Sequence, residues 1–211
     1  MKRILIADDH SIVRIGTTIL MKEVLGEETE VEEAATFDEA LSVIQKGNLD
    51  LILLDINIPG GNNMDMINAI KLRDGAAKIL VFSSYDESIF AMRYIKAGAN
   101  GYLSKESGEP EFKKAIESVL SGATYISDEL KSQSDNKQSD QKSDSGTIHS
   151  LSNREIEVMN MLIKGSSTTE ISQALNIRLN TVSTYKANIY TKLDVNNVVD
   201  LIAKVNMHYS S

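Results

Sequence analysis

Three short apolar runs constrain the fold of this 211-residue chain more than any other feature. They are Arg3–Ala7 (RILIA), Leu51–Leu54 (LILL) and Ile79–Phe82 (ILVF). Continuous apolar runs of this length are typical of central strands in a parallel sheet, because such strands are buried on both faces. Weaker runs at 30–35 (EVEEAA) and Asn100–Leu103 (NGYL) predict two further strands, and the three glutamates of the first favour an edge position.

Stretches with helical spacing of apolar residues separate these five runs. They lie at 12–24, 37–47, 64–73, 87–97 and 110–121. Strands that alternate with helices in this way predict an α/β fold, because each helix returns the chain to start the next parallel strand. We therefore expect a doubly wound, five-stranded parallel sheet of the flavodoxin-like type.

A polar segment divides the chain. Residues 131–147 contain no Val, Ile, Leu, Met or aromatic residue, so the segment has no apolar surface to offset the entropy of ordering. We interpret 126–148 as a flexible linker between a domain at 1–125 and a second domain at 149–211. The second domain shows helical patterns alone and is expected to be an all-α unit of four helices, near 153–164, 167–175, 179–193 and 196–208.

Charge and composition limit the classes of function. The net charge is −8, but residues 1–130 carry 13 Lys/Arg and 22 Asp/Glu, whereas residues 149–211 carry 6 Lys/Arg and 5 Asp/Glu. There is no cysteine, so disulfides and thiolate metal sites are excluded. No apolar run approaches the ~18 residues of a membrane span, and the N-terminal apolar run is too short for a signal peptide. We expect a cytoplasmic protein without membrane contact.

Polar residues follow each central strand. Asp8 and Asp9 follow the first strand, Asp55 the third, Ser83 the fourth and Lys105 the fifth. Ligands of doubly wound sheets bind at the carboxyl ends of the strands, so these side chains should meet at one edge. Three neighbouring carboxylates repel one another unless a cation joins them, and Mg²⁺ is the hard divalent ion that suits them.

This set of residues suits phosphoryl transfer to an aspartate. Lysine would pair with the new phosphate and the serine hydroxyl would hydrogen-bond it. Taken singly, the residues have simpler interpretations: Asp9 or Ser11 could cap the first helix, and Asp55 could start a turn before Pro59. Ser83 and Lys105 could likewise be ordinary loop residues.

Residues 1–121 resemble the receiver domain of response regulators. The resemblance rests on ILIADDH (4–10), LILLDINIPG (51–60), ILVFSS (79–84) and KAGANGYLSK (96–105). It implies that a sensor histidine kinase phosphorylates Asp55. It also implies that Asp9, Asp55 and the backbone carbonyl of Asn57 ligate Mg²⁺ directly, and that Asp8 acts through water.

The resemblance also implies a switch. Ser83 would move toward the phosphate, and Tyr102 would turn from solvent into the space that Ser83 leaves, while Lys105 pairs with the phosphate. Without the resemblance, Tyr102 would be a half-buried aromatic residue with a hydrated hydroxyl. Beyond Mg²⁺-dependent self-phosphorylation and autodephosphorylation, no enzymatic activity is implied.

Residues 150–208 resemble the LuxR-type helix-turn-helix domain of the NarL/FixJ subfamily. The resemblance rests on LSNRE (151–155), Gly165, Glu170-Ile171, Leu175, Thr181-Val182 and Lys192-Leu193. Ser152 and Glu155 form a capping-box pattern, and Gly165 suits a helix C-terminus.

The resemblance makes 179–193 the recognition helix in the major groove of double-stranded DNA. Val182, Ile189 and Leu193 share its apolar face. The residues expected to contact DNA are Asn180, Ser183, Thr184, Lys186, Ala187, Thr191 and Lys192. By pattern alone, a solvated helix face is an equal alternative.

Two positions of this helix carry less positive charge than is common in the subfamily. Ser183 replaces a common lysine and Tyr185 a common histidine. We therefore expect a shallow salt dependence of DNA binding and a homodimer as the active form. The helix at 196–208 carries more apolar residues than one core stripe needs, so part of it could form the dimer contact.

Three alternatives to a phosphorylation-gated transcription regulator are compatible with parts of the sequence. One is an orphan regulator that works without phosphorylation. Another is a Mg²⁺-dependent phosphohydrolase, although such enzymes carry a D-x-D motif on the first strand and this chain has Asp8-Asp9-His10 there. In the third, the C-terminal helices bind a protein in place of DNA, which the low basic charge would favour.

Overall fold

The computed structural model describes residues 1–61, 64–136 and 148–209. The chain divides into two compact units, 1–139 and 140–211, and each is described by itself. The predicted fold class is confirmed in both units: the first is a parallel α/β unit and the second is helical.

The first unit contains a five-stranded parallel sheet with the order β2-β1-β3-β4-β5. Its strands are β1 (Arg3–Ala7), β2 (Glu30–Ala34), β3 (Leu51–Leu54), β4 (Ile79–Ser83) and β5 (Gly101–Ser104). The glutamate-rich β2 lies at an edge, as the sequence predicted. All residues of β3 and β4 are buried, which explains why these two segments are apolar throughout.

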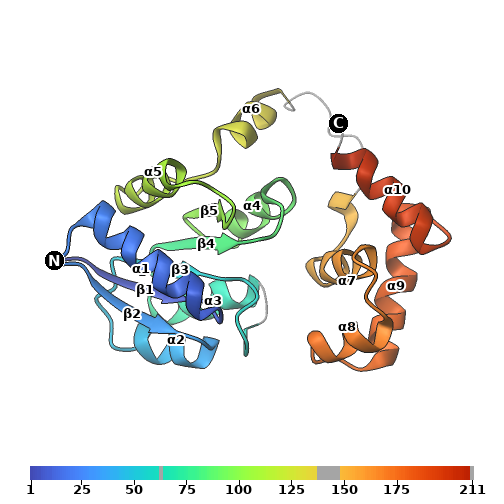
Figure 1. The fold of residues 1–211 in the computed structure, drawn as a ribbon, viewed down its shortest axis with the longest axis horizontal. Coiled ribbons are helices and arrows are strands. Elements are labelled where there is room, and N and C mark those ends of the chain that lie inside the picture. The colour runs from blue at the N-terminus through green and yellow to red at the C-terminus, as the bar shows by residue number, and fades with distance from the viewer. Residues whose placement is uncertain (62–63, 137–147, 210–211) are drawn as a thin grey trace. The chain divides into compact units, whose positions relative to one another are not determined.

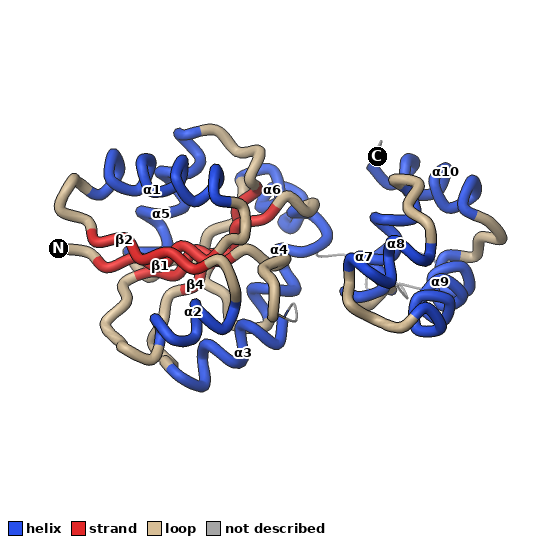
Figure 2. The backbone as a smooth tube through the Cα atoms, turned by 60° about the horizontal axis from the view of Figure 1, so that its bottom comes forward, coloured by secondary structure: helices blue, strands red, loops and turns tan. Residues whose placement is uncertain are grey.

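Helices cover both faces of this sheet (Figure 1). They are α1 (Ser11–Leu25), α2 (Phe37–Ile44), α3 (Met64–Arg73), α4 (Glu87–Lys96) and α5 (Glu109–Leu120). Figure 2 shows α1 and α5 on one face and α2 and α3 on the other. Helix α2 ends three residues earlier than predicted, because a tight turn through Gly47 and Asn48, both with positive φ, follows it.

The main core lies between the sheet and the α1–α5 layer. Side chains of β1, β3 and β4 meet Met21 of α1 and Phe112, Ile116 and Val119 of α5 there. Burial of such side chains contributes about 1.5–3 kcal/mol each to folding. The core therefore holds the strand ends in fixed positions, on which the site depends.

The segment after α5 corrects the predicted linker. Tyr125 is buried and pairs with Gly101 beside β5. Helix α6 (Asp128–Asn136) then occupies the first part of the segment that was predicted to be flexible. The polar composition of this segment did not predict the helix, because its support comes from polar contacts. Ser127 accepts a hydrogen bond from the Leu130 amide, and Asp128 forms ion pairs with Lys114 and Lys131. The rest of the predicted linker, 137–147, lies outside the described residues.

In residues 148–209, the described part of the second unit, the chain forms a 3₁₀ turn and four helices. These are η1 (Ile148–Ser150), α7 (Asn153–Ile163), α8 (Thr168–Ala174), α9 (Leu179–Leu193) and α10 (Val198–Tyr209). The predicted capping box of Ser152 and Glu155 is confirmed, and a second one joins Ser167 and Glu170 at α8. Gly165 has φ 87° just after α7, as expected of a helix C-terminus.

The apolar face of α9 forms the centre of this small core. Val182, Ile189 and Leu193 are fully buried there, and α10 adds Leu201 and Val205. Among the described residues, no helix has both the length and the apolar character that crossing a membrane requires.

Candidate functional site: an acidic cluster and a recognition helix

Strand register brings the expected residues to one edge of the sheet. Ala7 lies beside Leu54, so Asp8 and Asp55, the next residues along each strand, are neighbours. Ser83 lies beside Ser104, and the amide of Lys105 donates to the carbonyl of Ser83 at 2.8 Å. The parallel order of β1, β3, β4 and β5 thus assembles residues that lie almost a hundred positions apart.

Lys105 forms an ionic bridge between two buried carboxylates. Its Nζ lies 2.6 Å from Oδ2 of Asp8 and 2.9 Å from Oδ2 of Asp55. The side chains of Asp8 and Asp55 are only 2% and 3% exposed, so water cannot screen their charges. The bridge therefore supplies the positive charge that two such carboxylates require.

Burial affects the pKa of both Asp55 and Lys105 in this ionic bridge. It raises the pKa of Asp55 above its ordinary value, and the Lys105 charge offsets only part of that effect. Burial alone would lower the pKa of Lys105, but the neighbouring Asp55 and Asp8 carboxylates outweigh it and hold the pKa above its usual value. Lys105 therefore remains a permanent cation beside Asp55.

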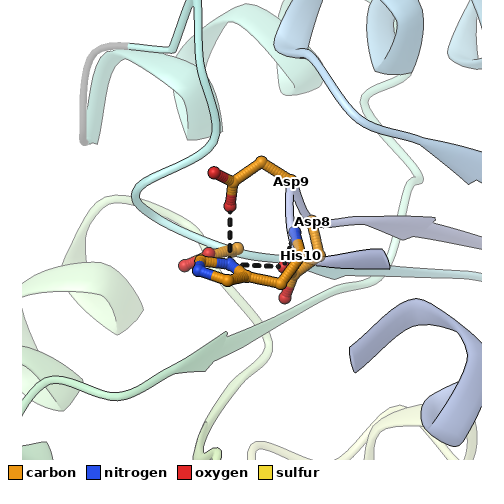
Figure 3. A group of neighbouring side chains, drawn as sticks. Asp8, Asp9 and His10 are labelled. Carbon is orange, nitrogen blue, oxygen red and sulfur yellow. Dashed lines mark hydrogen bonds and ion pairs between the residues drawn. The ribbon is translucent and has the colours of Figure 1, made fainter. Parts of the chain in front are cut away.

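Two more potential ligands lie where β1 passes into α1. The Nδ1 atom of His10 lies 2.8 Å from Oδ1 of Asp9 and 3.2 Å from Oδ1 of Asp8 (Figure 3). His10 is also the N-cap residue of α1, and no side chain caps this helix. The alternative role of Asp9 or Ser11 as a helix cap is therefore not what the structure shows.

The acidic cluster, defined as Asp8, Asp9, His10 and Asp55, has the composition of a divalent-cation site. Each residue offers one ligand atom, and these atoms lie within 4.8 Å of one another. Carboxylate oxygens are the ligands that Mg²⁺ prefers, so the donor set fits this ion. The amide of Asn57 donates to Oδ1 of Asp55 at 3.1 Å, which shows that Asp55 also starts a local turn.

The two remaining receiver residues both hydrogen-bond the backbone of Tyr85. Ser83 is fully buried and accepts a hydrogen bond from the Tyr85 amide at 3.1 Å. Tyr102 is fully buried as well, and its hydroxyl donates to the Tyr85 carbonyl at 3.0 Å. Burial raises the pKa of Tyr102 far above its ordinary value, so the hydroxyl remains a donor.

Tyr102 thus lies inward, in the orientation that the expected switch assigns to the active state. Its ring continues into a row of aromatic rings on α4: Tyr94 at 6.2 Å between centroids and Phe90 at 6.4 Å from Tyr94. Tyr85 stacks on Phe90 at 5.0 Å. A movement of Ser83 can therefore reach α4 through residues in direct contact, because Tyr85 bonds Ser83 and stacks on Phe90.

The second candidate site is the outer face of α9. Six residues of this helix that were predicted to meet DNA are exposed: Asn180, Ser183, Thr184, Ala187, Thr191 and Lys192. The seventh, Lys186, is partly exposed, and its ammonium lies 5.6 Å from the centre of the Tyr190 ring. These positions recur at helical spacing opposite the buried face of Val182 and Ile189.

Lys192 has a partner that the sequence pattern did not indicate. Its Nζ lies 2.7 Å from Oε2 of Glu155, a side chain only 4% exposed on α7. Burial would raise the pKa of Glu155, but Lys192 and the Ser152 amide outweigh this effect and hold the pKa below its ordinary value. Lys192 therefore ties α9 to α7 in addition to any contact with DNA.

Sequence reasoning missed two residues at these sites. His10 follows Asp8-Asp9 directly, and its adjacency in the sequence was the available signal. Asn188 is exposed on α9 next to Ala187, and helical spacing from Thr184 and Thr191 could have identified it.

Fold and sites together define a class: proteins that couple a phosphate-accepting aspartate on a parallel α/β unit to a helix-turn-helix unit. Residues 4–117 match the family of the response regulator receiver domain, and residues 149–205 match the luxR family of bacterial regulatory proteins. The chain belongs to the two-component response regulators of the NarL/FixJ subfamily, with a receiver domain and a LuxR-type DNA-binding domain.

Relatives of known name extend over nearly the whole chain. The response regulator UvrY of Escherichia coli (strain K12) is 31% identical over 201 residues, which cover 95% of this chain and 92% of UvrY. The fimbriae Z protein of Salmonella typhimurium (strain LT2) is 32% identical over 210 residues, covering 97% of this chain and 96% of that protein.

Solved structures agree on the fold. A LuxR-family response regulator from Aurantimonas sp. SI85-9A1 is 33% identical with a TM-score of 0.59, over 65% of this chain and 98% of that one. RcsB of Salmonella enterica serovar Typhimurium, solved on promoter DNA with BeF₃⁻, has a TM-score of 0.68 at 23% identity, over 98% of this chain and 99% of that one.

Proposed function

We propose that phosphorylation of Asp55 by a sensor histidine kinase in the cytoplasm switches the binding of double-stranded DNA by the C-terminal unit. The observation that carries this proposal is the buried Asp55 with the Lys105 ammonium 2.9 Å from one of its oxygens. A buried carboxylate beside a permanent cation is arranged to receive a dianionic group, because the cation offsets the charge that arrives.

The transfer is a displacement at phosphorus. A carboxylate oxygen of Asp55 forms the new bond to phosphorus, while the bond between phosphorus and the imidazole nitrogen of the kinase breaks and the imidazole leaves. Lys105 then exchanges its contact with the Asp55 carboxylate for one with the phosphate oxygens. Hydrolysis of the acyl phosphate by water returns Asp55, and this self-dephosphorylation limits the duration of the signal.

Mg²⁺ is the proposed cofactor. Asp9, Asp55 and the carbonyl of Asn57 would hold it directly and Asp8 would act through water. Its chemical contribution would be to neutralise charge on the transferring phosphoryl group. The proximity of the carboxylate oxygens of Asp8, Asp9 and Asp55 supports this assignment.

The signal would leave the site through Ser83 and Tyr102. A move of the Ser83 hydroxyl toward the phosphate would weaken the bond that it now accepts from the Tyr85 amide, and the Tyr102 hydroxyl is bonded to the carbonyl of the same residue. The bistable element in this proposal is the β4–α4 segment, which the aromatic rings of Tyr85 and Phe90 connect to Tyr102.

The output is the binding of α9 in the major groove, with the exposed residues of α9 facing the bases and Lys186 facing phosphate. A homodimer is the proposed active form, because one unit with a net charge of +1 binds DNA weakly. We place the proposed dimer contact on α10, where Val199 is 70% exposed.

Labelling with a small phosphoryl donor tests the proposal. Wild-type protein incubated with phosphoramidate and Mg²⁺ should shift on a phosphate-affinity gel, and Asp55→Asn should show no shift. Asp38→Asn, an exposed aspartate of α2, is the matched control and should label like wild type. Labelling that persists in D55N would refute the site.

DNA binding provides the second readout. Duplexes selected by the donor-treated protein from a random pool should bind the treated wild type at least tenfold more tightly than D55N. Equal binding by both would support the orphan regulator in place of the phosphorylation switch. Multiple-turnover hydrolysis of phosphate esters would instead support the phosphohydrolase.

A further inference from the structure

One strip of the outer face of α9, formed by Thr184, Ala187, Asn188 and Thr191, carries no charged residue, and its composition bears on which base it can read. This inference rests on the proposed DNA binding of α9. Thr184, Ala187, Asn188 and Thr191 are exposed and follow one another at spacings that place them on one face. They are the side chains closest to the bases if α9 enters the major groove.

The hydroxyl groups of this face are already engaged within the helix. Thr184 donates to the carbonyl of Asn180 at 3.0 Å, and Thr191 donates to the carbonyl of Ala187 at 3.0 Å. Ser183 donates to Leu179 at 3.2 Å in the same way. A threonine whose proton is used in this way offers DNA only its methyl group and the lone pairs of its oxygen.

The lysine side chains of α9 and the arginine that precedes it do not extend over this strip of residues. Lys192 pairs with Glu155 at 2.7 Å, and the ammonium of Lys186 lies over the Tyr190 ring. Arg178 is the N-cap residue, one position before the helix begins. Guanine is recognised chiefly by Arg or Lys on its O6 and N7 atoms, so this face lacks the usual means of reading guanine.

We propose that Thr184 and Ala187 make α9 selective for thymine, by contact of their methyl groups with the thymine C5 methyl. Thymine is the base that presents an apolar group in the major groove, and small apolar side chains are its usual contacts. Asn188, beside Ala187, has the amide that pairs with the N6 and N7 atoms of adenine. The expected half-site therefore has A·T pairs where the face of Thr184 and Ala187 meets the bases.

Replacement of thymine by deoxyuridine tests the contact, because the two bases differ only by the C5 methyl group. The full-length, donor-treated protein is titrated by fluorescence anisotropy with a duplex selected from a random pool, and then with duplexes carrying one replacement each. At one or two thymines of each half-site the replacement should weaken binding about fourfold, the value of one buried methyl group.

Two substitutions identify the side chain. Thr184→Ser removes the methyl group and keeps the hydroxyl, so T184S should bind the thymine duplex about fourfold more weakly than wild type does. Its affinity should not fall further when the thymine is replaced by deoxyuridine, because the methyl contact is already absent. Thr184→Val keeps a methyl group and removes the hydroxyl, so T184V should retain the difference between the two duplexes. Thr124→Ser, an exposed threonine in the other unit, is the matched control and should bind like wild type.

The outcomes separate the inference from the function on which it rests. Selected half-sites with A·T pairs, a loss at specific deoxyuridines and the T184S pattern support it. Tight, selective binding that ignores deoxyuridine, or a selected half-site read at guanine, overturns the thymine contact and leaves DNA binding intact. A random pool that yields no selected duplex contradicts the proposed DNA binding, and the thymine contact with it.

Discussion

Lys105 shows how a single residue holds the receiver site together. The sequence predicted it as the partner of a future phosphate, and the structure shows what it does beforehand: it joins the carboxylates of Asp8 and Asp55. Because both carboxylates are buried, their repulsion would otherwise oppose folding. The residue that is proposed to stabilise the phosphate therefore also stabilises the folded chain.

Substitution of Lys105 by methionine should reveal this second role. Methionine retains the bulk of the lysine stem but leaves two buried charges without a cation. We expect K105M to lower the free energy of unfolding by about 3 kcal/mol in the absence of divalent cations. Urea unfolding measures this difference.

Added Mg²⁺ makes the test specific. If Lys105 acts through its charge, saturating Mg²⁺ should stabilise K105M by more than it stabilises wild type, because the ion meets no competing ammonium. Equal stabilisation of both proteins by Mg²⁺ would show that Lys105 contributes packing alone.

At the scale of elements, the pair of Glu155 and Lys192 fixes the position of α9. Glu155 belongs to the capping box of α7, and Lys192 lies on the last turn of α9, so their contact joins two helices far apart in sequence. A recognition helix must be held rigidly to present its face to DNA. The pair holds α9 against α7, so in the proposed function it would affect DNA binding only through the position of α9.

The pH dependence of this contact can be predicted in sign. The folded-state pKa of Glu155 lies below its ordinary value of 4.5, so its ionised form stabilises the fold above that pH. This stabilisation is lost as the pH falls below 4.5 through the folded-state pKa. Glu155→Gln should lower the stability of α7 and α9 by about 1 kcal/mol at pH 7, a small value because the Lys192 side chain is 40% exposed.

Urea unfolding followed through the NMR amide signals of α7 and α9 measures this effect in the full chain. The difference between wild type and E155Q should shrink as the pH falls below 4.5. Glu170→Gln is the matched control, since Glu170 also closes a capping box, and its hydrogen bonds to described residues are with Ser167 and not with a lysine of another helix. A pH-independent difference for E155Q would contradict the ionic role.

At the scale of the whole molecule, charge is divided between the two units. Residues 1–130 carry a net charge of −9, whereas residues 149–211 carry +1. Several of the few cations in the second unit are also engaged: Arg154 pairs with Glu157, Lys192 with Glu155, and Lys204 donates to the Leu193 carbonyl. Long-range attraction to DNA is therefore weak.

This leaves Lys164, Arg178 and Lys186 to contact phosphates, or about six contacts in a dimer. The logarithm of the binding constant should fall with the logarithm of salt concentration with a slope no steeper than about −5. Anisotropy titrations of the donor-treated protein across potassium chloride concentrations measure the slope. A slope near −10 would mean that Lys192 and Arg154 leave their carboxylate partners when DNA binds.

The sequence alone determined the fold class and most of the receiver site. Apolar runs at β1, β3 and β4 need burial on both faces, and only a parallel sheet between helices provides it. Asp8, Asp55 and Lys105 then meet, because parallel strands end at the same edge. These inferences depend on hydrophobic periodicity and on the alternation of strand and helix patterns, both of which are visible along the chain.

Only the tertiary structure showed which charged side chains form ion pairs with one another. The contact of Lys192 with Glu155 crosses between elements, so no spacing along the chain indicates it. The sequence placed Lys105 and Asp8 at the same edge of the sheet, but it did not show that the two side chains form an ion pair. Helix α6 was missed for a related reason: its support comes from Ser127 and from the ion pair with Lys114 on α5. Local pattern specifies which elements form, whereas the pairing of charges depends on distances that exist only after the elements have packed.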